Sequence, residues 1–195
     1  MVVRLGSGHL FNLGLLVAAN SLDAEGGDFG NGPDGRVSGA TVRLALTGAA
    51  ANQGRIESTG DLAFSARSLA NTHSILANGA ASLQTAGALT SSGRVVAQSL
   101  AVRAGGDLAN SGLIGSLTAL SVAVGGRVDN SGSLLAQGGD LTLAAGGIVS
   151  SSGDIIAKNR LTLAAGGYET PAATARLGGT DVVVRLGSGH LFNLG

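Results

Sequence analysis

Two consecutive copies of one pattern occupy Asn110–Val149. The first copy reads NSGLIGSLTALSVAVGGRVD over residues 110–129, and the second reads NSGSLLAQGGDLTLAAGGIV over residues 130–149. Each copy opens on Asn-Ser-Gly, places apolar residues at alternate positions and then passes through Gly-Gly. Alternation of this kind is typical of a strand with one buried face. Its return after about twenty residues predicts a stacked repeat architecture.

The register of this stretch extends across the chain, with equivalent residues recurring every 19–21 positions. The predicted structural ladder consists of Asn12, Asn31, Asn52, Asn71, Asn110 and Asn130 in a polar column, of Ile56, Ile75, Val95, Ile114, Leu134 and Ile155 in one apolar column, and of Leu100, Leu120, Leu141 and Leu161 in another. We expect the polar column to continue through Ser91, Ser151, Ala172 and Asn193. Several apolar columns do not stay in phase over so many turns by chance.

Stacking explains why such short strands would be stable. Each repeat offers two or three strands that bury little alone, but each strand can pair in parallel with its counterpart one turn away, about 4.8 Å along the axis. Interior residues then stack like upon like, and the stability becomes a sum over neighbouring coils. The sequence predicts an all-β fold, a parallel β-helix (β-solenoid) of about nine coils with 19–21 residues per coil, roughly 45 Å long.

The corners of this solenoid are predicted from glycine. The Gly-Gly pairs, among them 105–106 and 125–126, are expected where the chain needs a positive φ or a close backbone approach. The Asn-x-Gly positions are expected to form another corner. Two stretches depart from the pattern, 28–37 and 168–180, because each introduces a proline. They are interpreted either as plain irregular turns or as outward loops with a contact role, the candidate contact residues being Asp28, Pro33, Asp34, Tyr168, Glu169 and Pro171.

Composition argues against several classes of function. The 12 basic and 12 acidic residues balance, which gives nucleic-acid binding no electrostatic footprint. The chain has no cysteine, so neither a disulfide framework nor a thiolate metal site is expected. No apolar run is long enough for membrane insertion. The first residues do not read as a signal peptide, because no apolar stretch and cleavage site follow the start.

The sequence shows no convincing chemical site. Residues 30–35 match G-x-G-x-x-G by letters, but a dinucleotide site needs a strand before the motif and a helix after it. His9, His73 and His190 have no partner ligands in neighbouring coils, and a metal site needs several. The acidic residues do not cluster across coils, apart from a row of alternating sign at Asp140, Arg160 and Asp181. We therefore expect no catalytic, cofactor-binding or metal-binding residues and no enzymatic activity.

One segment occurs twice. The sequence of residues 2–14, VVRLGSGHLFNLG, recurs unchanged as residues 183–195. The offset equals nine coils, so the duplicate falls in phase with the ladder. The expected domain organisation is a single β-solenoid segment over residues 1–195, uncapped at both ends. Open strand edges at such ends favour self-association of one copy on another.

The pattern N-x-G-x-I-x-A followed by L-x-L-x-A-x-G-G, seen at 110–128, 130–149 and 151–167, resembles the repeats of filamentous haemagglutinins. These are bacterial exoproteins of the two-partner secretion pathway, a group that includes contact-dependent growth-inhibition toxins. The resemblance implies that the β-helix is right-handed and acts as an extracellular shaft. It implies a secreted or bacterial cell-surface location, an outer-membrane secretion partner for the parent protein, and host-cell or bacterial surface receptors or glycans as further partners.

The expected function is therefore that of a non-enzymatic structural or adhesive shaft segment of a secreted haemagglutinin-like exoprotein. Such a shaft extends adhesive or toxin regions from the cell surface. The alternative is an engineered or self-stacking β-solenoid that assembles end to end into fibres. Growth of fibres that depends on both duplicated ends favours the alternative, whereas a monomer that binds cells or carbohydrate favours the adhesin.

Overall fold

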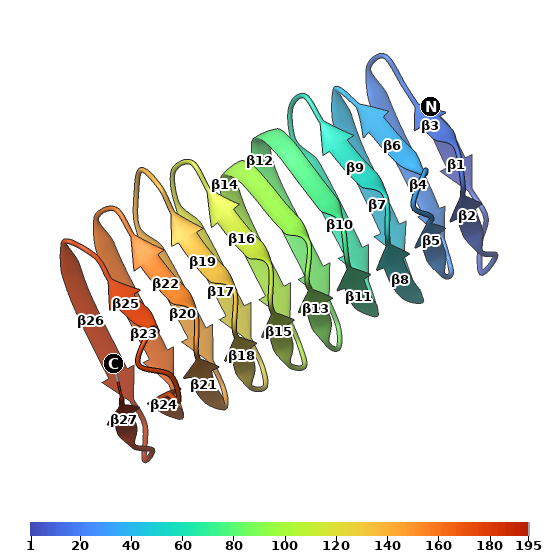
Figure 1. Ribbon diagram of the computed structural model, residues 1–195. Helices are drawn as coiled ribbons and strands as arrows, with labels where there is room; N and C mark the ends of the chain where they lie inside the picture. Colours follow the sequence, from blue (N-terminus) through green and yellow to red (C-terminus); the bar gives the residue numbers. More distant parts are fainter. Residues whose placement is uncertain (195) are drawn as a thin grey trace.

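The computed structural model describes residues 1–194, which form a single stack of parallel strands (Figure 1). Residues 1–194 contain no helix. The stack is a β-solenoid of about 10 turns with about 20 residues per coil. The predicted all-β parallel solenoid is therefore confirmed. In Figure 1 the coils follow one another in sequence order, so that each coil contacts only the coil before it and the coil after it.

Each coil has three faces. The first face contains β1 (Val2–Arg4), β4 (Ser21–Gly26), β7 (Thr41–Leu46), β10 (Leu62–Ala66), β17 (Leu120–Val124), β20 (Leu141–Ala145), β23 (Arg160–Ala165) and β26 (Asp181–Leu186). The second face contains β2 (Leu10–Asn12), β5 (Phe29–Asn31), β8 (Ala49–Asn52), β11 (Ser68–Asn71), β13 (Leu89–Ser91), β15 (Leu108–Asn110), β18 (Val128–Asn130), β21 (Ile148–Ser151), β24 (Gly167–Thr170) and β27 (Leu191–Asn193). The third face contains β3 (Leu15–Val17), β6 (Arg36–Gly39), β9 (Arg55–Ser58), β16 (Leu113–Ser116), β19 (Ser133–Ala136), β22 (Asp154–Ala157) and β25 (Arg176–Gly178).

Two long strands join the third face to the first. β12 (Ser74–Thr85) and β14 (Arg94–Ala104) each continue through the corner that other coils make with a turn. The first and third faces therefore form one 17-stranded sheet, while the second face is a separate 10-stranded sheet. A register irregularity between Ala77 and Ala80 lets β12 bend at that corner.

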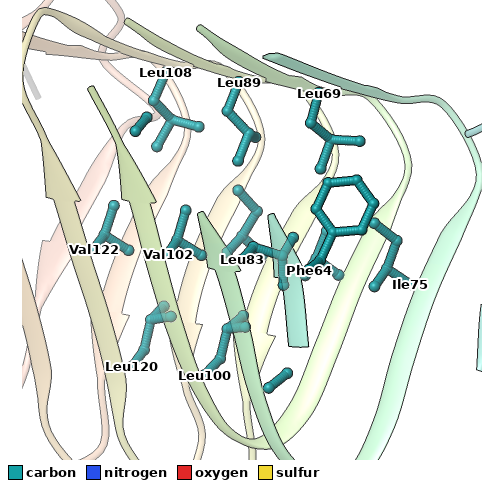
Figure 2. Close-up of a cluster of buried hydrophobic side chains, with 14 of the residues drawn as sticks. Phe64, Leu69, Ile75, Leu83, Leu89, Leu100, Val102, Leu108, Leu120 and Val122 are labelled. Atoms are coloured by element: carbon teal, nitrogen blue, oxygen red, sulfur yellow. The ribbon is translucent and has the colours of Figure 1, made fainter. Parts of the chain in front are cut away.

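The interior is filled by rows of aliphatic side chains. Ile56 pairs with Ile75 on the third face, and Leu100 pairs with Leu120 on the first, each residue facing its equivalent one coil away. Figure 2 shows how rows from the faces meet in the middle of the coil. The apolar ladder residues are at most 2% exposed: Ile56, Ile75, Val95, Ile114, Leu134, Ile155, Leu100, Leu120, Leu141 and Leu161. Complete burial of one such side chain contributes about 1.5–3 kcal/mol, so the repeated rows are the main source of stability.

The Gly-Gly corners are explained by close approach of the backbone. A Cβ atom on Gly125 would lie 2.2 Å from the carbonyl oxygen of Gly105, and one on Gly146 would lie 2.2 Å from that of Gly125. The amide of Gly126 donates to Gly106 O at 3.1 Å, which continues the ladder around the corner. Within residues 1–194, Gly6 alone has a positive φ. The alternative that these pairs need a positive φ is therefore wrong.

The coil that contains Pro171 departs from the prediction. Tyr168 lies in β24 as an interior residue that is 2% exposed, so its assignment to an outward contact loop is wrong. Thr170, not Ala172, continues the polar column, because it pairs with Asn193. Proline cannot donate to the strand ladder, so the extra residues enter after β24. The spacing to the next coil consequently rises to 23, outside the predicted 19–21.

Candidate functional site

A hydrogen-bonded column of asparagines, interrupted between Ser91 and Asn110, lies at the corner after the second face. The Nδ2 atom of Asn12 donates to Oδ1 of Asn31 at 2.8 Å, and the same bond joins Asn31 to Asn52 and Asn52 to Asn71. Asn110 donates to Asn130 in the same way, also at 2.8 Å. All of these side chains are at most 8% exposed. A buried amide must be paired to be tolerated, and each coil supplies the partner for the next.

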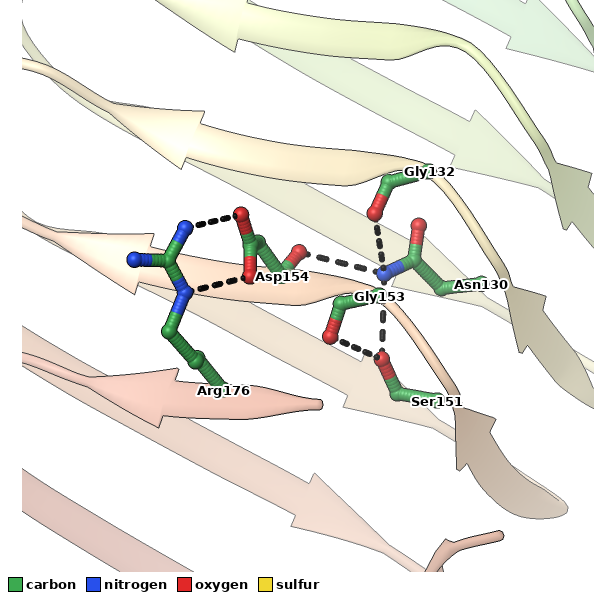
Figure 3. Close-up of polar contacts among 6 residues, drawn as sticks. All are labelled: Asn130, Gly132, Ser151, Gly153, Asp154 and Arg176. Carbon is green, nitrogen blue, oxygen red and sulfur yellow. Dashed lines mark hydrogen bonds and ion pairs between the residues drawn. The ribbon is translucent and has the colours of Figure 1, made fainter. Parts of the chain in front are cut away.

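The column also holds the backbone of the corner. Figure 3 shows Nδ2 of Asn130 between the carbonyl oxygens of Gly132, at 3.3 Å, and Asp154, at 3.1 Å, and the hydroxyl of Ser151, at 3.1 Å. Ser151 in turn donates to Gly153 O at 3.2 Å. One amide therefore ties two successive coils together at the point where the chain turns. This site is architectural, since its polar groups are buried and, apart from Oδ1 of Asn110, are paired within the corner.

A set of corner aspartates was missed by the sequence reasoning. Oδ1 of Asp28, Asp61 and Asp107 accepts, at 2.8 Å, from the backbone amide of Ala49, Ala80 and Arg127 one coil later. Asp140 accepts from the amide of Arg160 at 3.1 Å. At this turn the carboxylate takes the place of the backbone carbonyl oxygen that accepts the hydrogen bond between coils in the strands. In three of the four cases the residue that donates the amide is preceded by a glycine: Gly48, Gly79 or Gly126. A Cβ atom on any of these glycines would lie within 2.3 Å of the aspartate Oδ1, so this glycine was the feature of the sequence that could have indicated the contact.

Several ion pairs between neighbouring coils lie on the outer surface of the solenoid. Arg43 contacts both Asp23, at 2.7 Å, and Glu25, at 2.8 Å, and hydrogen bonds to Glu25 and Asp23 raise the pKa of its guanidinium. Arg176 binds both oxygens of Asp154, at 2.8 and 2.7 Å, and this hydrogen bonding lowers the pKa of the Asp154 carboxyl (Figure 3). Exposed pairs of this kind contribute little to stability, because solvent screens the two charges.

The histidines and charged residues that were considered as catalytic or metal-binding candidates do not gather at one site. His9 pairs with Asp28 at 3.0 Å between Nδ1 and Oδ2, whereas the His73 and His190 side chains are exposed in other coils. Arg160 lies 3.7 Å from Asp181, so the row of alternating sign contains one exposed ion pair. Within residues 1–194, no three His, Cys, Asp or Glu side chains gather closely enough to hold a metal ion. In the letter match at residues 30–35, a turn leads into strand β6, with no helix to receive a phosphate.

The predicted contact residues lie in three different settings. Pro33 and Asp34 are exposed in the turn between β5 and β6, and Glu169 and Pro171 are exposed at the end of β24. Asp28 is half-buried, because it accepts from Ala49 and pairs with His9. Tyr168 is interior, and burial raises the pKa of its hydroxyl. The exposed members therefore form two separate surface sites, about seven coils apart by the ladder register.

No helix within residues 1–194 has the length and apolar character required to cross a bilayer. The comparison with known families gives a match over residues 6–112 and 113–167, and the matching family is described as haemagglutinin repeat. The chain belongs to the haemagglutinin-repeat family. The matched residues cover most of the chain and end just before the coil with the insertion after Thr170. The resemblance inferred from the Asn-x-Gly and Gly-Gly pattern is thereby confirmed.

In the haemagglutinin repeats of this chain, the recurring asparagine is the buried column residue and the Gly-Gly pair is the tight corner. The repeats are structural units of a solenoid shaft. A search of curated proteins found no match, and a search of solved structures found none either.

Proposed function

We propose that this chain is a non-enzymatic shaft segment of a secreted bacterial haemagglutinin-like exoprotein. The observation that carries the proposal is that strand pairing and interior rows continue in phase through the whole stack. A stack in which each coil contacts only its neighbours has no preferred stopping point and grows in length at constant width. Ten strands on the second face correspond to about 43 Å of rise, because each interval adds about 4.8 Å.

Such a shaft separates what lies at its two ends. Figure 1 places the N- and C-termini at opposite ends of the stack, so that regions joined to them are held apart by the length of the rod. The proposed use is the display of adhesive or toxin regions at a bacterial cell surface, after export by an outer-membrane secretion partner. The supporting observation is the membership of the haemagglutinin-repeat family.

Deletion of whole coils tests the shaft directly. Removing residues 111–130 joins Asn110 to Ser131 and leaves every column in phase. The expected product is a folded rod that is shorter by about 4.8 Å, and removal of residues 111–151 shortens it by about 10 Å. Small-angle scattering and cryo-electron microscopy measure the length. The control deletes residues 111–120, half a coil, and should unfold, because it moves apolar residues out of the interior. A collapsed or globular product from the whole-coil deletions would refute the shaft.

The adhesive part of the proposal is assigned to the exposed residues Pro33 and Asp34 and to the exposed residues Glu169 and Pro171. Pro33 and Asp34 lie in the turn between β5 and β6, and Glu169 and Pro171 face away from the interior, so that these four residues can change without loss of the core. Binding of the chain to bacterial cells, host cells and a glycan array measures this role. Substitution of Pro33 and Asp34 by alanine should reduce binding at unchanged melting temperature. Equal binding by the variant and the wild type would remove these turns from the contact surface.

A second candidate function is end-to-end stacking into fibres. The observation that favours it is that both copies of the duplicated segment take the same place in a coil, with Val3 and Val184 in one row and Leu10 and Leu191 in another. Electron microscopy of the concentrated chain tests this function. Fibres should form with the wild type and be lost with Leu10→Lys, which places a charge in the interior row of the first coil. Absence of fibres at any concentration would leave the shaft as the function.

A further inference from the structure

Phe11 breaks the pattern of the outer surface of the second face. Its side chain points outward from β2 and is 74% exposed. The outward residues that pair in register with it and with one another are Gly30, Ala51, Ala70, Thr90, Ala109, Asp129, Ser150, Glu169 and Phe192. A large aromatic ring in a row of mostly small and polar residues is not required by the fold. Exposed apolar surface of this kind is typical of an interaction site.

A groove that would fit such a ring lies directly beside it. The groove has a volume of about 430 Å³ and runs along the second face from Phe11 across Gly30, Ala51 and Ala70 to Thr90. The surface is hollow at Gly30, Ala51 and Ala70, because these residues carry only a methyl group or no side chain. The Phe11 ring leans over the start of the groove, since a Cβ on Gly30 would lie 2.7 Å from its Cδ1 atom. One surface therefore carries both a projecting ring and a hollow for a ring.

The apolar surface continues around the corner from Phe11. Leu13 is 75% exposed and Leu15 is 77% exposed, and Leu13 covers Gly32 of the next coil, where a Cβ would lie 2.7 Å from Cδ2. The corresponding positions of later coils hold Gln53, Thr72 and Ser92 after the second face. Exposed apolar side chains thus lie at the two ends of the stack, with Phe192 and Leu194 at the other end, but only the Phe11 end has the groove beside them.

The charges beside the groove are complementary to one another. Asp28 and His9 form their pair at the same end of the groove as Phe11. Arg67 lies two coils further on, just before β11, and is exposed. Among residues 1–194 its guanidinium takes part in no ion pair, unlike that of Arg43. A two-fold axis between β5 and β8, parallel to the strands, brings the first coil of one copy opposite the fourth coil of the other. That arrangement places Arg67 of each copy near the His9–Asp28 pair of the other.

We propose that this part of the second face is a docking surface for a second copy of this chain. Two shafts lie side by side and antiparallel, and the Phe11 ring of each occupies the far part of the groove, over Ala70 of the other. The interface is isologous, so that association stops at the dimer. A patch of this size buries less than a standard interface of about 1,600 Å². The association is therefore weak and reversible.

Sedimentation velocity over a range of concentrations tests the proposal. The wild type should convert from monomer to a single dimeric species as its concentration rises. Phe11→Ser should lose this conversion, and so should Ala70→Arg, which fills the far part of the groove. The matched control is Phe192→Ser, because Phe192 has the same preceding sequence but lies beside Glu169 instead of a glycine. This control should dimerise like the wild type. A wild type that stays monomeric throughout, or a Phe11→Ser variant that associates unchanged, would overturn the proposal.

Cross-linking gives a second test that does not depend on stability. The chain has no cysteine, so a bismaleimide reagent reacts only where a cysteine is introduced. Ala51→Cys places the thiol next to the proposed two-fold axis, and Ala109→Cys places it in the same outward row three coils away. Dimers should form several-fold faster from Ala51→Cys. Equal rates would exclude the antiparallel arrangement. Open-ended ladders of cross-linked products would indicate end-to-end stacking instead.

Discussion

Ser91 and Asn110 occupy adjacent steps of the buried polar column, but they do not form a hydrogen bond. They are paired in register, yet Oδ1 of Asn110 is buried without a partner. Elsewhere in the column that oxygen accepts from the asparagine of the preceding coil, as in the bond from Asn52 to Asn71. The serine side chain ends in a hydroxyl where asparagine has a longer carboxamide group. Its oxygen therefore accepts a hydrogen bond from Asn71 at 3.2 Å but does not reach Asn110. The column therefore has a defect at this step.

Ser91→Asn should repair the defect and stabilise the chain by about 1 kcal/mol, the net contribution of one intramolecular hydrogen bond. The new amide can donate to the Asn110 oxygen in the geometry that the other coils already use. Chemical denaturation measures the free energy of unfolding. The converse variant, Asn52→Ser, should recreate the defect at Asn71 and cost about 1–3 kcal/mol. A destabilised Ser91→Asn variant would mean that this corner has no room for the amide.

Ser116 is a second buried polar group without a partner. Its hydroxyl is 1% exposed and unpaired, and its neighbours in the same row are Ala97 and Ala136. Ser116→Ala should leave the stability unchanged or raise it by up to about 1 kcal/mol, because a buried hydroxyl without a partner carries a desolvation cost. The matched control is Ser58→Ala in the same row. The Ser58 hydroxyl lies 2.9 Å from Ala40 O and 2.8 Å from Asp61 O, so its loss should lower the melting temperature.

The corner aspartates can be tested by a double-mutant cycle. Gly126→Ala should be strongly destabilising, because its Cβ would collide with the carboxylate of Asp107. Asp107→Ala removes the hydrogen bond to Arg127 but also makes room. We expect the double variant to be more stable than the sum of the two single changes, by about 0.5–3 kcal/mol. Gly178→Ala is the control and should be close to neutral, since nothing lies within 4 Å of its Cβ position. Strict additivity would show that the carboxylate is not the obstacle.

The Asp154–Arg176 pair predicts a dependence of stability on acid. The pair lowers the folded-state pKa of Asp154 below its ordinary value of 3.8. Its contribution is therefore present above the unfolded-state pKa and is lost as the pH falls through the folded-state pKa. Because the pair is partly exposed, the effect should be at most about 1 kcal/mol. Asp154→Asn should lower the melting temperature near neutral pH and match the wild type at pH values below the folded-state pKa. A constant difference at all pH values would contradict the pairing.

The periodic part of the fold could be predicted from the sequence, because the same side-chain types return at the same phase. The rows through Ile56 and Leu100 need only alternation and spacing, and these are visible in the letters. The coil with Pro171 could not be placed, since Thr170 and Ala172 are both small residues compatible with a corner. Which of them continues the polar column depends on where the extra residues enter, and that is decided by pairing between strands. Tyr168 was misplaced for the same reason.

The corner aspartates were missed for a different reason. Asp107 accepts a hydrogen bond from the backbone amide of Arg127, 20 residues further on, and the glycine before that donor does not by itself indicate which aspartate accepts. The groove beside Phe11 could not be predicted from the sequence either, because Gly30, Ala51 and Ala70 become neighbours only when the coils stack.

The hydrogen bonds between coils, such as that from the Gly126 amide to Gly106, point along the rod. A pulling force applied to the two ends therefore loads them one row at a time and not all together, so that the rod should unwind coil by coil under tension. Each released coil of about 20 residues adds about 65–70 Å of extended chain. A tether of this kind lengthens many-fold while its remaining coils stay folded, and it absorbs mechanical work before anything joined to its ends is torn away.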